Sequence, residues 1–381
     1  MKHLVRVLAL LGIMGISGAA LAQADPIRIG FFAPLTGPAA ADGESALNGA
    51  EVAVMALNEA GGVLGRPIEL VVYDDAFSPD EAANVTRRLI EQDDVVAVIS
   101  GSYSFTTRAG APIAQQNGVP FVAAYAVHPS ITGVGEYVFR MGTLATTQGA
   151  AGADLVANRL GLMRAAVLIV DNDFGTSLAE SFIRHYERLG GEVVMQEMYP
   201  LGEADFRPLI SGIRRADPDV IYAIGYFNEA SSFVRQLRES GIDTQVIGQE
   251  GFDSPTFLEL AGDTAEGVII TTELNRDSER AVVQDFLAAY LEHAGQPADA
   301  VSATSHDAVL LVAEAIRLAG STDPVAMIEA MAGITDFQAV SGPIHEFSDT
   351  RDAVRPVAIQ IVEGGEFHFF DEIDERELEL E

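Results

Sequence analysis

Residues that could catalyse a reaction or bind a metal are scarce in this sequence of 381 residues, and their spacing suits neither task. It has no cysteine, which excludes disulfides, zinc-thiolate sites and thiol catalysis. The histidines after the first 24 residues are His128, His185, His293, His306, His345 and His368. None has a partner four residues away, the spacing that places two metal ligands on one helix face. Since phosphate-loop and GxSxG motifs are also absent, we expect no enzyme, no metal site and no cofactor.

Ser104 has a position that suits ligand binding without catalysis. It lies between a predicted strand at 95–100 and a predicted helix at 106–116. Its hydroxyl and the N–H groups of Thr106 and Thr107 could converge there on a carboxylate, because helix N-termini attract anions. Alternatively, Ser104 only caps the helix and binds no ligand.

Short apolar runs alternate with amphipathic stretches along the chain, a pattern typical of βαβ units with parallel sheets. The first set begins with a strand at 27–32 and a helix at 45–60, which ends at a Gly-Gly pair. The same order restarts near Thr146, and its first strand is expected at 165–170. Length also favours two lobes, since a single hydrophobic core rarely serves more than about 300 residues.

The N-terminal residues have the features of a secretory signal peptide. Lys2 and Arg6 flank the start of an apolar run, and a stretch of small residues ends at Ala22. We expect cleavage after Ala22, or alternatively after Ala24, because the apolar run is too short to span a bilayer. The mature protein should then be soluble and periplasmic.

The chain is strongly acidic, with a formal net charge of −33. Nucleic acid is therefore not an expected partner, because binding to phosphates needs clustered Lys and Arg residues. Acidic residues are concentrated at 371–377, a segment that we interpret as a solvated tail.

Several short motifs, in a fixed order, cover nearly all of the chain after the leader. The first half contains IRIG (27–30), LTGP (35–38), NGA (48–50), NEAGG (58–62), GRP (65–67) and YDD (73–75). Further along come GVP (118–120), DNDFG (171–175), GQEG (248–251) and AEG (265–267). In their order and spacing these motifs resemble the periplasmic substrate-binding proteins of branched-chain amino-acid ABC transporters, the Leu/Ile/Val-binding protein family.

The resemblance implies an α/β fold of the type I periplasmic binding class. Two doubly wound parallel-sheet lobes would be joined by three hinge crossovers, which we place near Leu144, Glu273 and Arg351. The first lobe would comprise 25–144 and 274–350, and the second 145–273 and 351–381, ending in the acidic tail. A ligand would bind between the lobes, where the carboxyl ends of parallel strands meet.

In the first lobe, the resemblance assigns the ligand carboxylate to Ser104. Tyr125 and Ala126 match a loop that binds the ligand carboxylate and ammonium through backbone groups. Val127 stands where many relatives have Thr, so one side-chain contact would be missing.

In the second lobe, Glu250 matches the carboxylate that binds the ligand ammonium, and Phe174 and Tyr226 match aromatic residues that close over the ligand. A buried Glu needs a cation to pair with, because an unpaired buried charge is costly. The alternatives are an exposed loop position for Glu250, a core position for Phe174 and a solvated hydroxyl for Tyr226.

Asp42 departs from the family pattern, since it replaces the usual aromatic residue before Gly43 at the mouth of the cleft. It could accept a hydrogen bond or pair with a positive charge on the ligand side chain, or it could point into solvent. Phe77 and Tyr103 stand where some relatives carry a disulfide.

The resemblance implies a monomeric binding protein of an ABC importer. It would capture a small amino acid, by default branched-chain or otherwise aliphatic, and deliver it to a permease in the inner membrane. A small aromatic acid, an amide or a urea-like ligand remains an alternative, as does a sensory role. An exported enzyme is the least favoured alternative, which stays open because catalytic groups can lie far apart in sequence.

Overall fold

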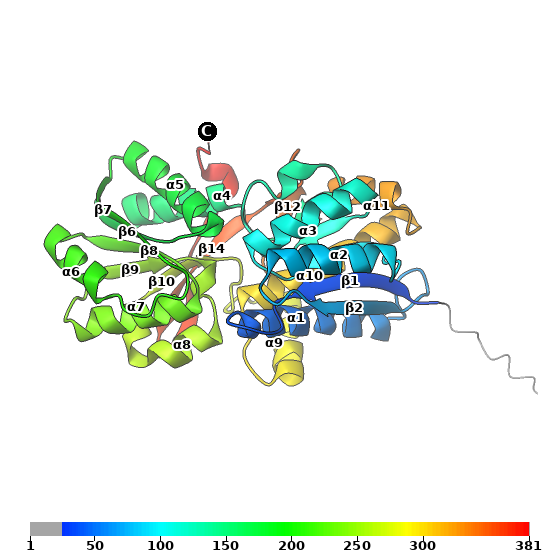
Figure 1. Cartoon of the computed structure of the whole chain (residues 1–381), viewed down its shortest axis with the longest axis horizontal. Coiled ribbons are helices and arrows are strands. Elements are labelled where there is room, and N and C mark those ends of the chain that lie inside the picture. Colours follow the sequence, from blue (N-terminus) through cyan, green and yellow to red (C-terminus); the bar gives the residue numbers. More distant parts are fainter. Residues whose placement is uncertain (1–24, 381) are drawn as a thin grey trace, which may run out of the picture.

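The computed structural model describes residues 25–380, which form two α/β lobes side by side (Figure 1). The predicted signal peptide, with cleavage after Ala22 or Ala24, lies outside these residues. None of the helices within 25–380 is both long and apolar enough to cross a bilayer.

The first lobe has a five-stranded parallel sheet in the order β2-β1-β3-β4-β5. Its strands are β1 (Ile27–Ala33), β2 (Ile68–Asp74), β3 (Ala97–Ser100), β4 (Phe121–Ala123) and β5 (Val138–Arg140). Its helices are α1 (Ala40–Glu59), α2 (Pro79–Glu91), α3 (Ser104–Asn117), α9 (Ala281–Ala294), α10 (Ala300–Ala319) and α11 (Pro324–Ala332). All of β1 except Arg28 is buried, as expected when helices cover both faces of a parallel sheet.

Helices α1 and α10 join distant parts of the chain in this lobe, and Figure 1 shows them close together. A Cβ atom on Gly49 of α1 would lie 2.1 Å from the carbonyl oxygen of Ser302 in α10. The two helix backbones can therefore approach this closely only with glycine at position 49. Their contact attaches residues 300–319 to the lobe that begins at residue 27.

The second lobe has a seven-stranded mixed sheet in the order β15-β14-β10-β9-β8-β6-β7. Its parallel strands are β6 (Arg164–Val170), β7 (Glu192–Tyr199), β8 (Val220–Ile224), β9 (Gln245–Gly248) and β10 (Ile269–Thr272). Its helices are α4 (Ala145–Asp154), α5 (Asp173–Arg188), α6 (Arg207–Ala216), α7 (Phe227–Glu239) and α8 (Pro255–Ala261). Helix α4 continues into a π-helical segment, Leu155–Arg159, and the sequence patterns predicted no helix there.

The expectation of a solvated acidic tail at 371–377 is wrong. Strand β15 (Glu366–Asp374) pairs antiparallel with β14 (Pro356–Glu363), and Ile373 lies opposite Val357. Beyond the strand, Glu375 accepts hydrogen bonds from the Thr147 hydroxyl at 2.8 Å and from the Arg355 N–H at 3.2 Å. Asp371, Glu372 and Asp374 lie on this edge strand, where outward charge also discourages pairing with another chain.

The chain passes between the lobes three times. It leaves the first lobe between β5 and α4, returns between β10 and α9, and crosses again just before β14. A small antiparallel sheet of β11 (Thr335–Phe337), β12 (Ile344–Phe347) and β13 (Ala353–Val354) precedes the third passage. The passages lie beside Leu144, Glu273 and Arg355, and the exact lobe limits stay a prediction.

Candidate functional site

A cavity between the lobes contains every residue that the sequence singled out for ligand binding. These are Asp42, Ser104, Tyr125, Ala126, Val127, Phe174, Tyr226 and Glu250. Tyr103, Gly251, Asp253 and Val301 complete the lining. The space between these side chains, including the part open to solvent, is about 410 Å³.

The lining residues meet because they follow the carboxyl ends of parallel strands. Tyr103 and Ser104 follow β3, and residues 125–127 follow β4. In the other lobe, Phe174 follows β6, Tyr226 follows β8, and Glu250 opens a short 3₁₀ helix, Glu250–Phe252, after β9. This is the edge at which open α/β sheets bind ligands.

Ser104 does not cap helix α3, so the alternative that it serves only as a helix cap is wrong. The helix begins at Ser104 itself, two residues earlier than predicted, with Tyr103 at the N-cap and no side-chain cap bond. The Thr107 N–H is consequently bound to the Tyr103 carbonyl at 2.9 Å and cannot serve a ligand. The N–H groups of the first helical turn and the buried Ser104 hydroxyl, which has no hydrogen-bond partner among residues 25–380, remain available.

Arg140, the last residue of β5, supports the loop at residues 125–127 by hydrogen bonds to its backbone. Arg140 is 0% exposed and donates to the Ala126 carbonyl at 2.5 Å and to the His128 carbonyl at 2.8 Å. The Val127 carbonyl accepts from the Ala145 N–H at 3.0 Å. The carbonyls of Ala126 and Val127 are therefore already bound within the protein, whereas the N–H groups of the loop have no acceptor among residues 25–380.

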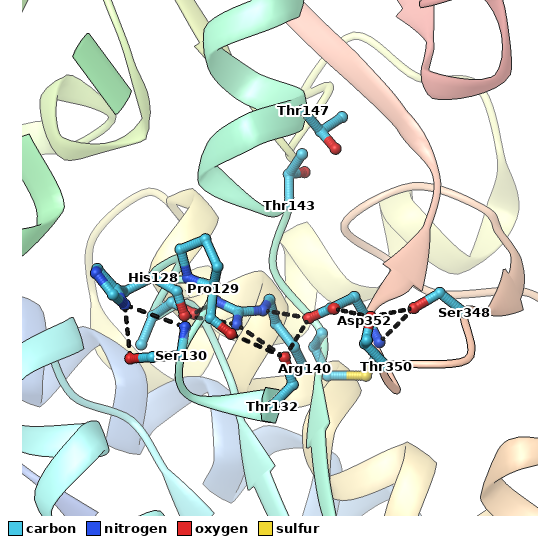
Figure 2. Close-up of polar contacts among 12 residues, drawn as sticks. His128, Pro129, Ser130, Thr132, Arg140, Thr143, Thr147, Ser348, Thr350 and Asp352 are labelled. Carbon is cyan, nitrogen blue, oxygen red and sulfur yellow. Dashed lines mark hydrogen bonds and ion pairs between the residues drawn. The ribbon is translucent and has the colours of Figure 1, made fainter. Parts of the chain in front are cut away.

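The charge of Arg140 is balanced by Asp352, which lies near the third passage between the lobes. The Arg140 Nε donates to the Asp352 carboxylate at 2.7 Å, and the hydroxyls of Thr132 and Thr350 donate to the same carboxylate at 3.0 and 2.8 Å (Figure 2). The pair thus links the ligand-facing loop to a hinge segment. Burial, together with the charges of Arg108 and Arg140, lowers the pKa of the neighbouring His128 to about 4, so this histidine is neutral at pH 7.

Glu250 is 8% exposed, and its Oε2 has no hydrogen-bond partner within the described chain. Burial and the negative charge of Glu273 raise its pKa well above the usual range. Glu273 lies in the second passage between the lobes, where it accepts from the Thr143 N–H at 2.9 Å and from Gln148 Nε2 at 3.3 Å. Burial also raises the pKa of Glu273, although the charge of Arg355 opposes the shift. A cation in the cavity would relieve this electrostatic strain at Glu250.

Aromatic rings from both lobes stack across the cavity. Tyr103 of the first lobe lies parallel to Tyr226 of the second, with ring centroids 4.5 Å apart, and Phe174 stacks on Tyr226 at 4.9 Å. An Arg108–Asp173 ion pair also bridges the lobes. Phe77 contacts Tyr103 edge-on at 5.2 Å, so rings touch where some relatives carry a disulfide. The lobes are therefore closed against each other.

Asp42 and Asp253 add two more carboxylates to the lining, and they differ in their partners. Asp253 pairs with Arg276 and accepts from the Thr272 hydroxyl at 2.5 Å, so its charge is compensated. Asp42 is 6% exposed and accepts a hydrogen bond from the Tyr103 hydroxyl at 2.5 Å. Burial is the main reason that its pKa is raised to about 7. The alternative of a solvent-facing Asp42 is wrong.

The sequence analysis missed four lining residues and the effect of the Glu273 charge on the pKa of Glu250. Tyr103 and Gly251 adjoin predicted residues, and Asp253 follows Glu250 by three positions, so a wider reading of each loop would have found them. Val301 reaches the cavity only through the packing of α10 on α1, for which the sequence holds no local signal.

Comparison with known proteins agrees with this geometry. Residues 26–366 match the family model described as periplasmic binding protein. A leucine-, isoleucine-, valine-, threonine- and alanine-binding protein of Pseudomonas aeruginosa is 30% identical over 90% of this chain and 91% of its own length. A branched-chain amino acid transporter substrate-binding protein of Streptococcus pneumoniae, solved with isoleucine, has a TM-score of 0.86 at 29% identity, covering 92% of this chain and all of the other.

Another similar structure contains a different kind of ligand. It is a solute-binding protein of an ABC transporter from Rhodopseudomonas palustris, in complex with 3,4-dihydroxybenzoic acid. Its TM-score is 0.84 at 28% identity, covering 92% of this chain and 98% of the other. The chain belongs to the periplasmic binding protein family, with a type I fold, and is a solute-binding protein of an ABC transporter rather than an enzyme.

Proposed function

We propose that the protein captures an amino acid between its lobes and presents it to an ABC permease. The observation that carries this proposal is Glu250, which lines the cavity and whose buried Oε2 has no hydrogen-bond partner among residues 25–380. A buried group left in this state is costly, and an α-ammonium group would satisfy it with a charge-assisted hydrogen bond.

The opposite side of the cavity supports an α-carboxylate. Three groups of donors there have no acceptor among residues 25–380: the Ser104 hydroxyl, the first N–H groups of α3 and the N–H groups of the 125–127 loop. A carboxylate can be bound by neutral N–H and O–H donors at a helix N-terminus. An amino acid brings both charges and therefore suits both sides at once.

The names of the relatives favour the same class, since one binds leucine, isoleucine, valine, threonine and alanine, and another was solved with isoleucine. We infer that the backbone amine and carboxylate of the ligand are bound in the same manner here. After export, the monomeric protein would meet its ligand in the periplasm.

A small aromatic acid is the second candidate, favoured by the rings of Tyr103, Tyr125, Phe174 and Tyr226 around the cavity. Aromatic ligands stack well on such rings, and one similar protein was solved with 3,4-dihydroxybenzoic acid. Such an acid offers no cation to Glu250, which would then have to stay protonated.

A ligand screen on protein freed of any carried ligand by unfolding and refolding distinguishes the two. Amino acids, amides and benzoates would be compared by thermal shift, and positive results measured by calorimetry. A ligand at 100 times its Kd adds about 2.7 kcal/mol to the free energy of unfolding. We expect stabilisation by at least one amino acid. Stabilisation by benzoates alone would replace the proposal with the aromatic-acid alternative, and no stabilisation by any class would refute both.

A further inference from the structure

Asp42 and Tyr103 line the cavity but are not among the groups that we assign to the α-ammonium and α-carboxylate of the ligand. Asp42 lies in the first turn of α1, in the first lobe, whereas Glu250 belongs to the second. Among residues 25–380, the hydroxyl of Tyr103 is the single hydrogen-bond donor to Asp42. The other carboxylate oxygen of Asp42 is therefore left for a ligand.

The cavity has no positive charge of its own to compensate Asp42. Neither Lys, Arg nor His occurs among its described lining residues. The nearest charges are themselves negative, because Asp299, Asp253 and Glu229 all act on Asp42. Of these, Asp253 is already paired with Arg276. An aliphatic ligand side chain beside Asp42 would leave this buried carboxylate without a partner of opposite charge, which is unfavourable.

Tyr103 fixes the position of Asp42. It donates to Asp42 through its hydroxyl at 2.5 Å, while its ring is held by stacking on Tyr226 at 4.5 Å. A positively charged nitrogen of the ligand would therefore meet a carboxylate that is already held in place.

We propose that the ligand is an amino acid whose side chain carries a positively charged nitrogen, and that Asp42, supported by Tyr103, is the residue that selects it. This inference rests on the proposed function, because it takes the α-amino acid part of the ligand as bound by Glu250 and Ser104. It departs from the aliphatic ligand that the family resemblance implied.

The test compares amino acids that differ only in the side-chain amine. Calorimetry would measure the Kd of lysine against norleucine, and of ornithine against norvaline, for the parent and for Asp42→Asn. We expect the parent to bind one charged member at least about tenfold more tightly than its uncharged counterpart, as for a pairing worth about 1.4 kcal/mol. Asp42→Asn should remove most of this margin and leave the uncharged member within about threefold of its parent Kd.

Glu250→Gln is the matched control, because both members of each pair carry the same α-ammonium and should lose affinity alike. Thermal unfolding of each variant without ligand checks that it folds. If the parent binds norleucine and norvaline as tightly as lysine and ornithine, or more tightly, the inference about Asp42 is wrong while the proposed function stands. The same holds if Asp42→Asn still prefers the charged amino acids. If no amino acid binds to the parent at all, the proposed function fails, and the inference fails with it.

Discussion

Replacing Glu250 by Gln should change ligand affinity and protein stability in opposite directions. In the ligand-bound state, the variant leaves an α-ammonium desolvated in a closed cavity without its carboxylate. In the ligand-free state, the variant removes a buried charge that faces the carboxylate of Glu273. Replacing a residue that only stabilises the fold would not change affinity and stability in opposite directions.

The magnitude of the affinity loss follows from the burial of the pair. Truncating one member of a buried, hydrogen-bonded charge pair costs about 2 to 5 kcal/mol. Since about 1.4 kcal/mol corresponds to a tenfold change, Kd should rise at least about thirtyfold. Ser104→Ala should cost only about 1 kcal/mol, because the N–H groups around the carboxylate remain.

The stability change should depend on pH in a defined direction. Burial and Glu273 raise the pKa of Glu250 above the value of about 4.3 expected in the unfolded chain. Between these two pKa values the folded state binds more protons than the unfolded state, so stability falls as pH rises. Glu250→Gln lacks this loss, and its stability relative to the parent should increase as pH rises above about 4.3, by up to about 1.4 kcal/mol per pH unit.

Urea unfolding at several pH values from 4 to 8, without ligand, measures this difference, and calorimetry at pH 7.5 measures affinity. Groups that do not interact with Glu250 titrate alike in both proteins and cancel in the comparison. Unchanged affinity in Glu250→Gln would show that no ligand ammonium contacts this residue. A difference in stability that is the same at every pH would show that Glu250 is not held in a desolvated position.

Three further results are expected. Asp352→Asn should lower the free energy of unfolding by about 3 to 5 kcal/mol in urea titrations, because it leaves the buried charge of Arg140 unpaired, and a loss below about 1 kcal/mol would contradict this role. Gly49→Ala should destabilise by about 1 to 3 kcal/mol through a clash with the backbone of α10, whereas Gly133→Ala, where a Cβ meets nothing within 4 Å, should stay within about 0.5 kcal/mol. Asp42→Asn should gain stability relative to the parent as pH rises from about 4 towards 7, because the pKa of Asp42 is raised to about 7 in the folded protein; a difference unaffected by pH would place this carboxylate in solvent.

The sequence alone determined the two α/β lobes and the strand ends at which the site forms. Apolar runs and amphipathic stretches repeat over short distances, so they reveal strands and helices without knowledge of the partner segments. Loops after parallel strands necessarily meet at one edge of a sheet. The family resemblance assigned Ser104, Tyr125 and Glu250 to the ligand, and each of the three follows the end of such a strand in its own lobe.

Only the tertiary structure decided how each carboxylate is used. Asp42 lies inside the cavity instead of in solvent because the closed lobes cover it and Tyr103 binds it. Glu273 raises the pKa of Glu250 because the second passage between the lobes brings the two carboxylates together. The acidic residues at 371–377 lie in and after an edge strand because β15 pairs with β14. Burial and charge interactions depend on segments that are far apart in sequence. A local sequence pattern does not show which distant segment will pack beside it.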